Sequence, residues 1–215
     1  MSRPVPPIRR RVLFLPGFGA GDGSTTVLRT AIAAHGHRVH RWRAGRNTGP
    51  TPELIESLET RLRSIAARPD PARGGTDGAA GRADPTPPVK KVTIVGWSLG
   101  GVYGWILAGR SPELVDQLIT LGSPLHRGQF GMKTLPMPVT SIWSKQDGVV
   151  PWESSLVKGD LTENIEVYGT HITLGFDPLV THAIADRLNQ HPDHWQPFRP
   201  PRWAREAYPS RRRAG

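Results

Sequence analysis

The chain has 215 residues, of which 37% are apolar, with 24 Gly and 22 Pro. This length fits one domain with a buried core, and the Gly and Pro content indicates many turns and irregular additions rather than a second packed domain. The absence of Cys excludes disulfides, thiolate metal sites and cysteine nucleophiles.

The net charge of +10 comes mostly from Arg. Much of it lies in residues 9–11 and in the tail at 199–213, and neither segment belongs to a recognisable nucleic-acid module. We therefore expect no specific nucleic-acid partner, and at most a weak electrostatic association with anionic surfaces.

No apolar run approaches the roughly 20 residues that a membrane-spanning helix needs. The first residues place positive charge before an apolar stretch, as a signal peptide does. That stretch, residues 12–15, is far shorter than the roughly 7–15 residues of a signal core. We therefore expect a first strand here, no membrane span and a cytoplasmic location.

The first predicted strand is the apolar run at residues 11–15, which Pro16 and Gly17 end. A helix is predicted at 25–34, with Asp22 or Ser24 available to cap its start. Residues 38–42 alternate apolar and basic side chains, which is typical of a strand near the edge of a sheet.

Residues 51–67 carry apolar side chains at helical spacing, with Pro52 in the first turn, and predict a second helix. The stretch from 68 to 88 is rich in Pro, Gly and charge. It has too little apolar surface to offset its ordering entropy, so we expect a flexible surface loop.

The rest of the chain alternates strands and helices, which indicates βαβ units. The predicted fold class is therefore α/β, with a mostly parallel sheet flanked by helices on both faces. We expect one domain at 1–195 and a basic, Pro/Arg-rich C-terminal tail at 196–215. The later predicted strands are 89–97, 115–121, 139–143 and 165–168, and the later helices are 99–109 and 179–188.

Residues 96–100 form a Gly-x-Ser-x-Gly motif at the end of a predicted strand and the start of a predicted helix. That context is the one expected of a nucleophile elbow, with Ser98 on a strained turn that lifts its hydroxyl above the sheet. Gly96 and Gly100 fit this reading because a side chain there would collide with the backbone.

With this motif the chain resembles the α/β-hydrolases, and among them the small lid-less lipases and esterases, over residues 12–188. The resemblance implies a nucleophile, an acid and a base that follow three successive strands in that order. The link at 122–138 is too short for the helical cap domain that many members insert. We therefore expect an open, shallow cleft and modest substrate discrimination.

The resemblance implies that the base follows the last strand, where His171 lies. His182 falls within the last predicted helix and suits packing or the surface. His35, His37 and His40 lack a carboxylate at ligand spacing, so we interpret them as surface residues rather than a metal site.

For the acid we favour Asp147, which follows the strand at 139–143, as the resemblance implies; an Asp-Gly turn at this position is compatible with that role. Asp116 begins a strand, and Asp160 lies in a polar loop. Asp177 is the serious competitor because it comes soon after the proposed base.

The resemblance also implies an oxyanion hole made of the backbone N–H groups of Leu99 and Phe18. Pro16 stands where the family often has His in this loop. The glycines at 17, 19 and 21 lack the spacing of a dinucleotide or P-loop motif. We therefore expect no cofactor and no metal.

The leading hypothesis is hydrolysis of a small-molecule or lipid ester through a Ser-His-Asp triad and an acyl-enzyme. Thioester hydrolysis or acyl transfer would use the same triad. A binding protein without activity, with its basic termini as the contact surface, is the hypothesis of another class. The candidate pocket walls are Phe18, Trp97, Leu99, Phe130, Met132 and Trp152.

Overall fold

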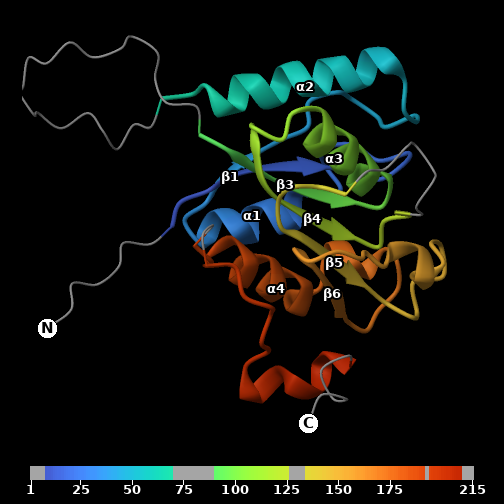
Figure 1. Ribbon diagram of the computed structural model, residues 1–215. Coiled ribbons are helices and arrows are strands. Elements are labelled where there is room, and N and C mark those ends of the chain that lie inside the picture. Colours follow the sequence, from blue (N-terminus) through green and yellow to red (C-terminus); the bar gives the residue numbers. More distant parts are fainter. Residues whose placement is uncertain (1–7, 70–89, 126–133, 192–193, 210–215) are drawn as a thin grey trace, which may run out of the picture.

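A computed structural model describes residues 8–69, 90–125, 134–191 and 194–209. It contains a six-stranded sheet in which all neighbouring strands are parallel, in the order β2-β1-β3-β4-β5-β6 (Figure 1). The strands are β1 (Arg11–Leu15), β2 (Arg38–His40), β3 (Val92–Trp97), β4 (Val115–Leu121), β5 (Val139–Trp143) and β6 (Thr162–Glu166).

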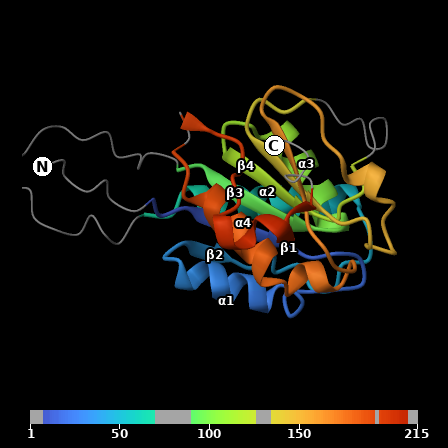
Figure 2. The same ribbon diagram turned by 90° about the horizontal axis from the view of Figure 1, so that it is seen from below.

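Helices cover both faces of this sheet, so the predicted fold class is confirmed (Figures 1 and 2). On one face, α2 (Pro52–Ala66) and α3 (Leu99–Arg110) pack against side chains such as Leu13 and Ile94. On the other, α1 (Thr26–Ala34) and α4 (Pro178–Leu188) pack against alternate residues such as Val12 and Val95. Successive side chains of a strand point to opposite faces, which places two hydrophobic clusters on either side of the sheet.

The predicted bounds of β1, β4 and β5 agree with the structure, whereas β6 begins three residues earlier than predicted and ends at Glu166. The start of β6 was not predicted because its first three residues are polar. Glu163 is buried because its carboxylate pairs with the buried Arg187 of α4. The side chain of Asn164 exchanges hydrogen bonds with the backbone of Val157.

The capping prediction for α1 was wrong. Thr25 occupies the N-cap without a side-chain cap bond. The Asp22 carboxylate instead accepts hydrogen bonds from the backbone N–H groups of Trp42 and Arg43, and these bonds turn the chain away from β2 after His40.

The surface assignment of the histidines was also wrong for His37. It is 4% exposed, and its Nδ1 accepts a hydrogen bond from the N–H of Arg10. Burial and neighbouring arginines lower the pKa of His40 to about 4. Among the described residues, no group of His, Cys, Asp or Glu has an arrangement suited to a metal ion.

The segment after Trp195 contributes to the core. Phe198, Ala204 and Tyr208 are buried against α4, and the Tyr208 hydroxyl donates to the carbonyl of Leu179. The predicted flexible loop falls almost wholly outside the described residues. None of the described helices is both long and apolar enough to cross a bilayer.

Candidate active site

Ser98 lies on a sharp turn between β3, which ends at Trp97, and α3, which begins at Leu99. Its backbone has φ 55° and ψ −125°, a conformation that costs a non-glycine residue roughly 1–3 kcal/mol. The turn is held on both sides. The N–H of Ser98 donates to Leu121, and its carbonyl accepts from Gly101.

The two motif glycines are required by close backbone contacts. A Cβ on Gly96 would lie 2.4 Å from the carbonyl oxygen of Gly100, and one on Gly100 would lie 2.1 Å from that of Leu15. Both distances are far below van der Waals contact, so the spacing of the motif follows from how tightly α3 approaches the sheet.

His171 and Asp147 form a buried pair beside this turn. Nδ1 of His171 lies 2.8 Å from Oδ2 of Asp147, and the two residues are 8% and 5% exposed. The other carboxylate oxygen, Oδ1, accepts from the N–H groups of Val149 and Val150 at 3.0 and 2.6 Å. The N–H of His171 also donates to the Asp147 carbonyl. These bonds fix the loop after β5, which carries Asp147, relative to the loop after β6, which carries His171.

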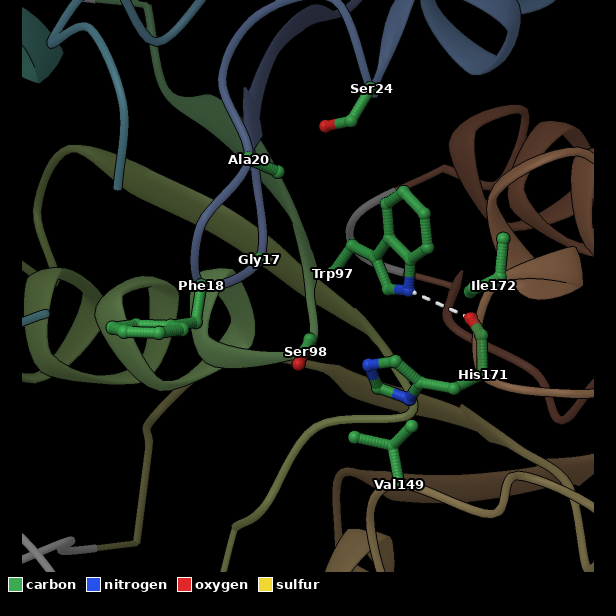
Figure 3. A pocket seen from close by; sticks show the side chains of 9 residues that line it. All are labelled: Gly17, Phe18, Ala20, Ser24, Trp97, Ser98, Val149, His171 and Ile172. Carbon is green, nitrogen blue, oxygen red and sulfur yellow. Dashed lines mark hydrogen bonds between the residues drawn. The ribbon is translucent and has the colours of Figure 1, made fainter. Parts of the chain in front are cut away.

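Ser98 and His171 line the same pocket, which has a volume of about 290 Å³. Figure 3 shows one ring nitrogen of His171 directed toward Ser98. Because Nδ1 faces Asp147, the nitrogen on the Ser98 side is Nε2. The indole N–H of Trp97 donates to the His171 carbonyl at 3.1 Å and ties the histidine loop to β3.

The competing residues lie elsewhere. Asp177 caps α4 by accepting from the N–H of Leu179, and Asp116 pairs with Arg10 and accepts from Thr93. Asp160 is exposed. The ring of His182 packs against Phe198 and Trp203.

The loop after β1 lies next to the turn at Ser98. A Cβ on Gly17 would lie 3.1 Å from that of Ser98, so this loop directly adjoins the candidate nucleophile. In the part of the chain that the structure describes, the N–H groups of Gly17, Phe18 and Leu99 donate to no protein acceptor. The Phe18 N–H is the predicted donor from this loop, and Gly17 supplies a further candidate.

The pocket walls differ from the predicted set. Trp97 and Phe18 line the pocket, but Trp152 stacks on Trp143 at 4.9 Å between ring centroids and is not among the lining residues. Leu99 packs toward the core on the α3 side. Phe130 and Met132 lie outside the described residues. The lining is Gly17, Phe18, Ala20, Ser24, Trp97, Ser98, Val149, His171 and Ile172.

Val149 and Ile172 are pocket residues that the sequence did not predict, and each is 66% exposed. A signal was present, because each directly follows or nearly follows a candidate catalytic residue. Neighbours of residues at the carboxyl edge of a parallel sheet share the crevice where ligands of such folds bind.

No protein-family model and no curated protein matches the sequence. Solved structures do match. Lipase B of Aspergillus fumigatus is 16% identical with a TM-score of 0.62, over 87% of this chain and 55% of that one. A monoacylglycerol lipase of Paleococcus ferrophilus is 14% identical with a TM-score of 0.61, over 85% and 95%.

A pyrethroid hydrolase of Sphingobium faniae JZ-2 is 13% identical with a TM-score of 0.61, over 86% of this chain and 99% of that one. The chain spans about half the length of the Aspergillus lipase (55%) and nearly all of the two others. Together with the sheet order and the turn at Ser98, these likenesses show that the chain has the α/β-hydrolase fold.

Proposed function

We propose that the protein is a serine hydrolase that cleaves carboxylic esters, with Ser98 as nucleophile, His171 as base and Asp147 as acid. One observation carries the proposal: the Asp147 carboxylate accepts from Nδ1 of His171 at 2.8 Å, while the opposite ring nitrogen is directed toward Ser98 in the same pocket (Figure 3). The solved structures of similar fold include a lipase, a monoacylglycerol lipase and a pyrethroid hydrolase, which agrees with this class.

The proposed reaction begins when Nε2 of His171 takes the hydroxyl proton of Ser98 as the oxygen bonds to the ester carbonyl carbon. Asp147 holds the imidazole in the required tautomer and stabilises the imidazolium. The negative carbonyl oxygen is bound by the free N–H groups of Phe18 and Leu99.

His171 then gives the proton to the departing alkoxide, and the alcohol leaves an acyl-enzyme on Ser98. A water molecule, deprotonated by His171, attacks the acyl carbon. Collapse of the second tetrahedral intermediate returns the proton to Ser98 and releases the carboxylic acid.

The pocket favours small apolar groups on the ester. Its volume of about 290 Å³ is at the lower end of the range for ligand sites. Apart from Ser98 and His171, Ser24 supplies the polar side chain of its lining, and Phe18, Val149 and Ile172 form a highly exposed apolar rim. We propose a small-molecule or lipid ester with a short apolar group as the substrate.

The test compares the wild type with Ser98→Ala in fluorophosphonate labelling and in hydrolysis of p-nitrophenyl esters of increasing acyl length. Ser98→Ala should lose labelling and about 10⁴-fold or more of kcat. Equal ester hydrolysis by the two proteins would overturn the proposal. Parallel assays with thioesters and with competing alcohols measure the hydrolysis and acyl transfer that the same residues support.

A further inference from the structure

Asn47 binds the loop after β1 along its length, although it lies in a segment that the reaction above does not use. Its backbone carbonyl accepts from the N–H of Gly19 at 2.7 Å, and its N–H donates to the carbonyl of Ala20 at 2.8 Å. Its side-chain Nδ2 donates to the carbonyl of Pro16 at 2.9 Å. Asn47 has an exposed fraction of 0%, so water does not compete for the groups of Asn47 that make these bonds.

These bonds leave selected groups of the loop free. Two further carbonyls of the loop are also used, since that of Gly17 accepts from Ala20 and that of Gly19 accepts from the Arg46 side chain. Buried backbone polar groups in folded proteins are nearly always paired, and Gly17 is a buried residue. The N–H groups of Gly17 and Phe18 therefore stand out as donors that the fold holds in place without a protein acceptor.

Asn47 also reaches the helix that follows the nucleophile. Its Oδ1 accepts from the hydroxyl of Tyr103, in α3, at 2.7 Å. Burial raises the pKa of Tyr103 to about 12, so its hydroxyl stays protonated and donates. The first residue of α3 is Leu99, the source of the other proposed oxyanion donor. One buried amide thus connects the two backbone segments on which the oxyanion would rest.

We infer that Asn47 is a positioning residue that fixes the distance between the Phe18 loop and the start of α3, and so the geometry of the oxyanion hole. The inference rests on the proposed function. Donors aimed at a developing charge act only when they are held in place beforehand. A side chain that holds both segments therefore affects the transition state more than the bound substrate.

The test uses Asn47→Ala and measures kcat, KM and inhibition by a trifluoromethyl ketone, which forms a tetrahedral oxyanion on a nucleophilic serine. We expect kcat to fall about 10–100-fold, as displaced donors produce, while KM stays within about twofold. Affinity for the ketone should fall by a factor close to that of kcat, because both depend on the oxyanion.

Ile55→Ala is the matched control. Ile55 is buried in the same hydrophobic cluster as Tyr103 but has no hydrogen bond to the loop. It should lower the melting temperature while kcat and ketone affinity stay within about twofold of wild type. An Asn47→Ala protein with the same kinetics as this control, or one with a raised KM and an unchanged kcat, would overturn the inference.

If Asn47→Ala does not fold, Tyr103→Phe replaces it. This variant keeps the buried ring and removes the hydroxyl that donates to Oδ1 of Asn47. It should lower kcat about threefold at constant KM, and an unchanged kcat would contradict the inference. A wild type that neither hydrolyses esters nor binds the ketone would instead overturn the proposed function, and the inference with it.

Discussion

The two sides of the candidate site are held by different forces. On the nucleophile side, the turn at Ser98 has two backbone hydrogen bonds and is further fixed by backbone packed against backbone, with no room for a Cβ at Gly96 or Gly100. On the other side, Asp147 and His171 come from separate loops after β5 and β6, and hydrogen bonds between those loops hold them.

The difference shows which parts of such a site a sequence can reveal. Close packing demands a particular residue at a fixed spacing and leaves a motif. Hydrogen bonds between loops can be made by many residue types and by backbone groups, so they produce no sequence motif. A residue that makes them can be predicted only from its place after a strand. Substitution of a packed glycine should therefore affect folding, whereas substitution of a side chain in the hydrogen-bonded pair should affect activity at nearly constant stability.

The largest effect is expected for Asp147→Asn. Oδ1 is held by the N–H groups of Val149 and Val150, so the new amide nitrogen must face Nδ1 of His171. It then donates to Nδ1, which leaves the proton on Nε2, where it blocks proton transfer from Ser98. The expected loss of kcat is about 10⁴-fold, with a melting temperature near that of the wild type.

Asp177→Asn is the control for this variant. Asn caps helices as well as Asp does, so α4 keeps its cap at Leu179 and kcat should stay within about twofold. If Asp177→Asn lost the activity and Asp147→Asn kept it, the acid of the site would be Asp177. The proposed role of the Asp147–His171 pair would then be wrong.

Next in size is Gly100→Ala, on the packed side. The new Cβ would meet the carbonyl oxygen of Leu15 at 2.1 Å, and α3 would have to move from the sheet. We expect a loss of about 3 kcal/mol or more in the free energy of unfolding, measured by denaturant titration. Gly23→Ala meets nothing within 4 Å and should change stability by no more than about 0.5 kcal/mol. Equal stabilities for the two variants would contradict the packing argument.

The sequence predicted the parts that depend on periodicity and on glycine. The alternating apolar runs were enough for the fold class and for the exact ends of several strands. The sequence failed where a polar residue is buried by a distant partner, as in β6, where Glu163 meets Arg187 from α4. Asn47 was missed for the same reason, because its partners come from the loop after β1 and from α3.

The smallest of these effects is expected for Trp97→Phe, which lies where the two sides meet. The indole N–H donates to the His171 carbonyl at 3.1 Å, and Phe cannot replace that bond. A lost bond of this kind is worth about 1 kcal/mol, so kcat should fall by about fivefold. Trp143→Phe is the matched control, because the Trp143 indole nitrogen is buried without a hydrogen-bond partner in the described chain. Its kcat should stay within about twofold of wild type, and equal losses in the two variants would assign the effect to packing instead of to the bond at His171.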